Sequence, residues 1–183
     1  MVDLEEAIAV QRAALNLRPE GTPNRSTSLG NLANSLRMRF KRRETMADLE
    51  EAITLEHAVL ELRPEGHPER SLALCNLADS LRTLFHHGRR IADLDEAIVL
   101  ERAALELRQE GHPDRSLALG HLANSLKTRF QHGGTIADLD EAILLEFSAL
   151  ELRPEGHPDH SLSLGNLAIC MACALNEVGG WLI

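Results

Sequence analysis

Histidine and cysteine are the side chains of this sequence whose spacing could support metal binding or nucleophilic catalysis. Three histidines recur at intervals of 45 residues in one repeated Gly-His-Pro phrase: His67, His112 and His157. Such a recurrence is typical of a structural turn residue, because an active site is built once. His86, His87 and His132 fall in more variable segments near basic residues, which predicts solvated side chains.

The three cysteines do not form a recognisable reactive set. Cys170 and Cys173 have the spacing of a redox pair, but one Cys-x-x-Cys without a second ligand pair is weak evidence for metal or redox chemistry. Cys75 occupies a position that glycine holds in the other copies of the repeat described below. No phosphate-binding glycine loop, HExxH or GxSxG motif is present. We therefore expect no catalytic residue, no cofactor and no metal, in a protein that is not an enzyme.

Composition and charge narrow the class of protein. The chain has 183 residues, 44% of them hydrophobic but only 3% aromatic, so its core must be built from Leu, Ala and Ile, which favour helix. The net charge of −9 repels phosphate backbones and anionic lipid headgroups, which argues against nucleic acid and membrane as partners. With no leader segment or long apolar run, we expect a cytoplasmic protein.

An internal repeat organises the whole sequence. The segment Asp48–Ile53 returns at residues 93–98 and 138–143, and residues 3–8 carry the same element, so the period is 45 residues. Each copy contains two helical patterns. The first, named helix A, has apolar residues at i, i+3, i+4, i+7 and i+11, as in Leu29, Leu32, Ala33, Leu36 and Phe40.

The second pattern, named helix B, opens with an Asp followed three residues later by a Glu, as in Asp48 and Glu51. We expect the Asp to cap the helix and the Glu to reach back to it. A Gly-x-Pro turn then separates helix B from the next helix A. The pattern predicts helix B over residues 3–18, 48–63, 93–108 and 138–153, and helix A over residues 23–42, 68–87, 113–132 and 158–177.

Two-helix units of this size must stack to bury their apolar faces, so we expect one all-α domain over residues 1–183, a solenoid of about eight helices. Asn31, Leu32 and Ala33 in helix A, with Ala97 and Ala104 in helix B, resemble tetratricopeptide repeats of the kinesin-light-chain type. The resemblance implies a right-handed α-solenoid that binds proteins or peptides.

The sequence departs from that family in its 45-residue unit, since the usual unit is about 34 residues. The long Leu- and Ala-rich form is similar to repeat arrays of mushroom-forming fungi that often precede a CHAT protease domain. Besides an interaction scaffold, the chain is therefore interpreted as a sensor or docking arm of a larger protein, such as a CHAT protease or an NTPase receptor. The last helix A is divergent or truncated, and the sequence ends in an apolar Trp181-Leu-Ile.

The resemblance places the binding groove on helix A, on the face away from the Leu32 and Leu36 stripe. Helical phase puts ten side chains there: Asn31, Asn34, Arg37, Asn76, Asp79, Arg82, His121, Asn124, Lys127 and Asn166. Amides suit a peptide backbone, and a row of cations suits an acidic segment or a C-terminal carboxylate. The alternative is that these cations pair with acids of helix B or with the end of helix A. We also expect self-association through the uncovered first and last helices.

Overall fold

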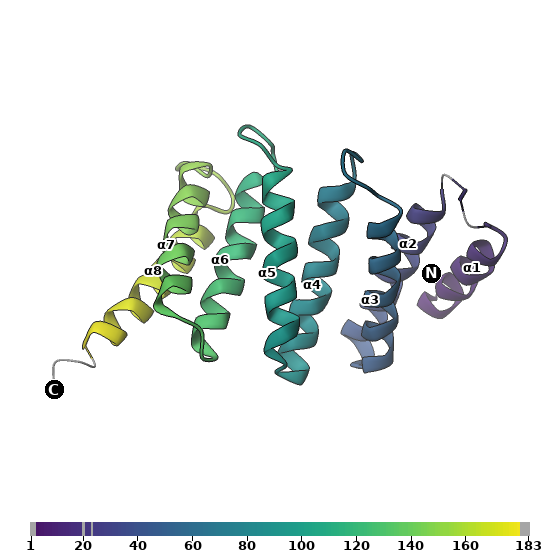
Figure 1. Cartoon of the computed structure of the whole chain (residues 1–183), viewed down its shortest axis with the longest axis horizontal. Coiled ribbons are helices and arrows are strands. Elements are labelled where there is room, and N and C mark those ends of the chain that lie inside the picture. The colour runs from purple at the N-terminus through teal and green to yellow at the C-terminus, as the bar shows by residue number, and fades with distance from the viewer. Residues whose placement is uncertain (1–2, 20, 23, 180–183) are drawn as a thin grey trace. The chain divides into compact units, whose positions relative to one another are not determined.

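The computed structural model describes residues 3–19, 21–22 and 24–179. The segments with helical periodicity in the sequence form helices in it. In this part the chain forms eight α-helices and no strand (Figure 1). They are α1 (Leu4–Asn16), α2 (Arg25–Arg43), α3 (Met46–Glu61), α4 (Arg70–Gly88), α5 (Ile91–Glu106), α6 (Arg115–Gln131), α7 (Ile136–Glu151) and α8 (His160–Gly179). The predicted helical fold is confirmed. The start of the first helix A at residue 23 and the terminal Trp181 lie outside the described residues.

Contacts between helices divide the chain into two compact units, residues 1–88 and 89–183. Unit 1 contains α1 to α4 and unit 2 contains α5 to α8. Within each unit every helix packs against the next one along the chain. Helices α2, α4, α6 and α8 are the A helices of the sequence pattern, and the others are the B helices.

The apolar stripes build the core of each unit. In unit 1, Leu32 and Leu36 of α2 pack with Ile8 of α1 and Ala52 of α3, all at most 2% exposed. In unit 2, Leu122 and Leu126 of α6 and Leu139 of α7 are equally buried. Full burial of each such side chain is worth about 1.5–3 kcal/mol. Because the apolar stripe of each A helix faces the core, the opposite face of the helix points away from the core.

Three of the four B helices, α3, α5 and α7, begin two residues earlier than the sequence pattern suggests. Asp3 does cap α1, since its side chain accepts a hydrogen bond from the Glu5 amide. However, α3 starts at Met46 with Thr45 as its N-cap, so the capping role predicted for Asp48 is wrong. Asp48 lies in the first turn and is 4% exposed. Its carboxylate forms an ion pair with an arginine of the preceding A helix instead.

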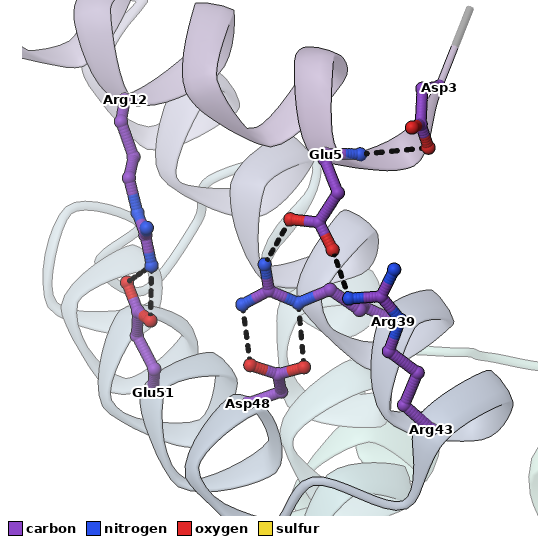
Figure 2. Close-up of polar contacts among 7 residues, drawn as sticks. All are labelled: Asp3, Glu5, Arg12, Arg39, Arg43, Asp48 and Glu51. Atoms are coloured by element: carbon purple, nitrogen blue, oxygen red, sulfur yellow. Dashed lines mark hydrogen bonds and ion pairs between the residues drawn. The ribbon is translucent and has the colours of Figure 1, made fainter.

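That arginine is Arg39 of α2, which joins three helices of unit 1 (Figure 2). Arg39 Nη2 lies 2.6 Å from Asp48 Oδ1 of α3, and Arg39 Nη1 lies 2.7 Å from Glu5 Oε2 of α1. Unit 2 repeats the arrangement 90 residues later, with Arg129 between Asp138 at 2.5 Å and Asp95 at 3.0 Å. We name each of these sets an arginine clamp. The clamp fixes an A helix between two B helices.

The turn after each B helix is closed by side-chain hydrogen bonds. Gly66 has a φ of +84°, a left-handed conformation that favours glycine. His67 Nδ1 accepts a hydrogen bond from the Glu69 amide at 3.1 Å. His112 and His157 accept the equivalent hydrogen bonds from the amides of Asp114 and Asp159. Arg70 donates to the Arg63 carbonyl at the end of α3. The recurring histidines thus act as turn residues.

The last helix leaves part of its apolar stripe exposed. Leu164 of α8 is 45% exposed, whereas Leu119 at the same position of α6 is 4% exposed. Met171 is 46% exposed, whereas its counterpart Leu126 is fully buried. In the structure α6 is packed between α5 and α7, but among the described residues α8 contacts mainly α7. Self-association through this face remains a prediction.

Candidate functional site on the A helices

Two of the predicted asparagines are exposed on the face of α2 that points away from the core. Asn31 and Asn34 of α2 are exposed, while Leu32 and Ala33 between them are buried at 2% and 1%. Asn76 of α4 is half-buried. Side-chain amides on this face are available to donate to and accept from a peptide backbone.

The cation row of unit 1 is paired with acids. Arg37 Nη1 lies 3.3 Å from Glu56 Oε1, and Arg37 Nη2 lies 3.8 Å from Asp79 Oδ2. Asp79 Oδ1 also lies 2.6 Å from Arg82 Nη2, so this carboxylate sits between two guanidinium groups. Arg37 additionally donates to the Asn76 carbonyl at 3.4 Å. Pairing with an acid of helix B, the alternative to a ligand role, is therefore what the structure shows for Arg37.

The buried partner of this row is Glu56, which was not among the residues predicted from the sequence. Glu56 is 4% exposed. The glutamates at the same repeat position are also buried, Glu101 at 4% and Glu146 at 1%. A signal was present, because Glu56 follows Leu49 by seven residues and Ala52 by four, on the apolar face of helix B. A charged residue recurring every 45 residues on a buried face indicates a polar site rather than a solvated surface.

Burial sets the charge of Glu56. Loss of solvent raises the pKa of its carboxyl group to about 7, against the opposing effects of the Ser80 hydroxyl and the Arg37 guanidinium. Near neutral pH this glutamate is therefore partly protonated. The set of Arg37, Arg82, Asp79 and Glu56 then carries a net positive charge whenever Glu56 is protonated.

Unit 2 brings the equivalent residues together with different neighbours. His121, Asn124 and Lys127 of α6 and Asn166 of α8 are all half-buried. Burial raises the pKa of Glu146, and Lys127, Arg153 and a hydrogen bond from Asn166 oppose that rise. Of the predicted side chains, Arg37 thus contacts the buried Glu56 in unit 1, and Lys127 and Asn166 lie near the buried Glu146 in unit 2.

Cys170 of α8 is a buried thiol that lies near Glu146. Cys170 is 1% exposed, and burial raises the pKa of its thiol, which disfavours the reactive thiolate. Cys75 and Cys173 are half-buried thiols outside any disulfide. Across the described residues, no three His, Cys, Asp or Glu side chains are grouped as metal ligands would be. Nor does any described helix combine the length and the apolar character needed to cross a bilayer.

Comparisons with known proteins agree on the fold. The sequence model of the family described as Tetratricopeptide repeat matches residues 25–69. No curated protein sequence matches the chain. The structure is similar to a crystal structure of nearly identical TPR-like repeats from a protein described as a kinesin light chain of Podosopora anserina. That similarity has a TM-score of 0.72 at 17% identity, over 94% of this chain and 80% of the other.

A second solved structure is a variant form of the same Podosopora anserina protein, with a TM-score of 0.72 at 17% identity over 94% of this chain and 79% of the other. A third is BtubC (BKLC) from P. vanneervenii, with a TM-score of 0.71 at 19% identity over 94% of this chain and 66% of the other. The resemblance to tetratricopeptide repeats is confirmed by that family model and by the fold shared with these structures. At these identities the likeness establishes the fold.

Proposed function

We propose that this tetratricopeptide-repeat chain is a non-catalytic protein-interaction scaffold whose A helices bind an extended peptide or a partner helix. The observation that carries the proposal is the pair of exposed amides on α2. Asn31 and Asn34 are exposed on a helix whose other face is filled by Leu32 and Leu36, so the core does not require them. Amides that satisfy a bound backbone are a recurring device in peptide recognition.

The cation row supplies the preferred ligand chemistry. Arg37 and Arg82 flank one carboxylate, Asp79, and the raised pKa of Glu56 leaves their charge incompletely balanced near pH 7. An acidic side chain of the ligand can share these two guanidinium groups with Asp79. We therefore propose an acidic segment as the partner, with an affinity that falls as salt concentration rises.

Charge reversal tests this proposal. Partners recovered by pull-down with the full chain are assayed against the variant Arg37→Glu, Arg82→Glu, Lys127→Glu. We expect at least about a tenfold loss of affinity, within the effect of truncating paired charges in interfaces. The matched control reverses three arginines outside the A helices, Arg12, Arg90 and Arg102, and should bind as the wild type does.

A second variant avoids any effect of a new charge beside Glu56. Asn31→Ala with Asn34→Ala changes two exposed side chains, so the fold should be retained. We expect this variant to bind more weakly by about tenfold, which corresponds to about 1.4 kcal/mol. Unchanged affinity in both folded variants would place the binding surface elsewhere on the molecule.

A further inference from the structure

A groove lies in unit 2 where α5 ends and the chain turns toward α6 (Figure 1). Its volume is about 670 Å³, within the range of pockets that bind small molecules. Residues of the B helices α5 and α7 line it, together with the first residue of α6 and Leu122, and we name it the B-helix groove. None of the ten residues that the sequence places on the A-helix surface is among its lining residues. The groove is therefore a separate surface.

Three leucines give the B-helix groove an apolar floor. Leu105 of α5 and Leu145 of α7 are half-buried, and Leu122 of α6 is 1% exposed. The two half-buried side chains leave apolar surface in contact with solvent. Covering this surface with an alkyl chain of a partner is favourable.

The charged residues of the groove are not balanced. Glu106, Glu110 and Glu141 line it with only two cations, Arg102 and Arg115, so three carboxylates against two guanidinium groups leave a net charge of −1. Arg102 Nη2 lies 2.6 Å from Glu141 Oε2, and these two residues neutralise each other. The excess of negative charge therefore belongs to the end of α5.

Glu106 and Glu110 supply this excess charge. Both are exposed, and neither forms an ion pair within the part of the chain that the structure describes. Arg115 is directed elsewhere, because its Nη1 donates to the carbonyl oxygens of Leu105 and Arg108. The last carbonyls of α5 are also the negative end of the helix dipole, where a further cation is stabilised.

Unit 1 repeats this arrangement 45 residues earlier. A groove of about 330 Å³ is lined there by Leu60, Glu61, Glu65 and Arg70, which hold the same repeat positions. Arg70 again donates to carbonyl oxygens at the end of its B helix, those of Leu60 and Arg63. Two acids beside a leucine are thus a feature of the repeat, and unit 2 adds α7 to make the larger groove.

We propose that the B-helix groove binds a basic side chain, Lys or Arg, of a partner protein. The alkyl stem lies on Leu105 and Leu145, and the charged end reaches Glu106 and Glu110. Lys and Arg cover apolar surface with their stems while the charge stays near water, and two exposed carboxylates at the rim suit this placement. The inference goes beyond the proposed function, because it gives the chain a second surface with the opposite charge preference.

Other occupants fit the groove less well. An acidic side chain would meet the two uncompensated carboxylates, Glu106 and Glu110, and be repelled. An apolar side chain would cover the leucines but gain nothing from these acids. A metal ion lacks a ligand set, since no three His, Cys, Asp or Glu side chains of the described residues are grouped to hold one.

The first test is an NMR titration of the full chain with N-acetyl-lysine amide and with N-acetyl-arginine amide, following the methyl signals of Leu105 and Leu145. N-acetyl-norleucine amide has a similar alkyl stem without a charge and is the matched probe. We expect the two basic probes to shift both leucines in a saturable way and to bind at least about threefold more tightly than norleucine. No saturable shift, or an equal affinity for norleucine, would overturn the proposal.

Removal of the two acids makes the titration specific. Glu106→Gln with Glu110→Gln keeps the size of both side chains and should weaken the basic probes by about three- to tenfold, because each exposed ion pair contributes modestly. The matched control, Glu61→Gln with Glu65→Gln, removes the same charges from unit 1 and should leave the titration at Leu145 unchanged. Equal weakening by both pairs would reduce the effect to net charge and would contradict a site in unit 2.

A third variant keeps the acids and occupies them. Gln109 is exposed and lines the B-helix groove, so Gln109→Lys should fold normally and place a cation of the chain itself beside Glu106 and Glu110. We expect it to weaken the basic probes about as much as removal of the acids does. Unchanged affinity in Gln109→Lys would show that the probe does not bind at these carboxylates.

A peptide-display selection against the full chain tests whether a protein segment uses the groove. Enrichment of Lys or Arg that is lost in Glu106→Gln with Glu110→Gln, and kept in the unit 1 control, supports the proposal. Basic peptides that the first variant still binds, or no enriched basic peptide, would overturn it. Reversal of Arg37, Arg82 and Lys127 to Glu should leave this binding intact, so the B-helix groove and the A-helix surface can fail independently.

Discussion

The two units share one polar device and differ in another. Arg39 in unit 1 and Arg129 in unit 2 hold the same pair of carboxylate positions with nearly the same distances. The buried glutamates differ in their neighbours: Glu56 lies near Arg37, Asp79 and Ser80, whereas Glu146 lies near Lys127, Arg153, Asn166 and Cys170.

The clamps and the buried glutamates therefore have different roles, the first in packing and the second in the chemistry of the A-helix surface. The clamp binds one A helix to two B helices, so altering it disturbs the packing of the whole unit. The glutamate lies beneath the outward face of the A helices, so altering its neighbours changes the chemistry offered there. The repeat can therefore keep its fold while each unit presents a different polar surface.

Removal of either clamp should have the largest effect on stability. Arg39→Leu leaves Asp48, which is 4% exposed, without its ion pair, and Arg129→Leu does the same to Asp138 at 7%. We expect each to lower the free energy of unfolding by about 3–5 kcal/mol, because an uncompensated charge remains buried. Urea unfolding measures the loss, and hydrogen exchange should place it in unit 1 or unit 2 respectively.

Arg12→Leu is the matched control for the clamps. It removes a 2.6 Å ion pair with Glu51 whose side chains are 46% and 39% exposed (Figure 2). Solvent screens such a pair, so the loss should not exceed about 1 kcal/mol. A loss equal to that of Arg39→Leu would mean that burial of Asp48 does not give the clamp its strength.

The free energy of unfolding should also depend on pH. Since the folded pKa of Glu56 is about 7 and its ordinary value is 4.5, folded protein retains a proton that unfolded protein loses between these pH values. Stability should therefore fall as pH rises from about 4.5 to 7, by at most about 3 kcal/mol. Glu56→Gln should remove this contribution, as measured by urea unfolding at pH 5 and pH 8. A variant that retained the full wild-type slope would contradict the raised pKa.

A smaller change should make the two units more alike. Cys170 occupies the position that Ser80 holds beside Glu56 in unit 1, and the serine at this position of α6, Ser125, hydrogen bonds to Glu101 at 3.0 Å. In Cys170→Ser, the hydroxyl can donate to Glu146 more strongly than a thiol does, which should lower the pKa of that carboxyl group. We expect a gain in stability of about 1 kcal/mol at pH 8 and less at pH 5. A gain that is equal at both pH values would point to packing instead.

The smallest expected effect lies in the turns. His67→Ala removes one exposed hydrogen bond from the Glu69 amide, and His112→Ala removes its counterpart in unit 2. Each should cost about 0.5–1.5 kcal/mol in unfolding free energy, with binding unchanged. Loss of binding in either variant would give these histidines more than a turn role.

Periodicity was sufficient for the helices but not for their polar contacts. Leu32 and Leu36 could be placed in the core because a helix has a fixed angular step. The cap at Asp48 could not be placed, because a capping Asp and a buried ion-paired Asp have the same spacing from Glu51. What separates them is Arg39, nine residues earlier in sequence and adjacent only after folding.

The exposed residues of the candidate site could be predicted from the sequence. Helical phase placed Asn31 and Asn34 outward, and they are exposed. It could not reveal that Arg37 is bound to Glu56, because that contact depends on how α2 and α3 pack together. It also could not reveal the small cavity of about 30 Å³ lined by Asn34, Glu56 and Arg63, since such a space depends on side-chain packing rather than on spacing.

The central claim is that the A helices carry the binding surface. Its most direct test is NMR mapping of backbone amide shifts on the full chain when a partner segment recovered by pull-down is added. We expect the largest shifts on α2, α4, α6 and α8, around the rows of Asn31, Asn34 and Arg37 and their repeats. Shifts confined to the exposed faces of α1, α3, α5 and α7 would contradict it.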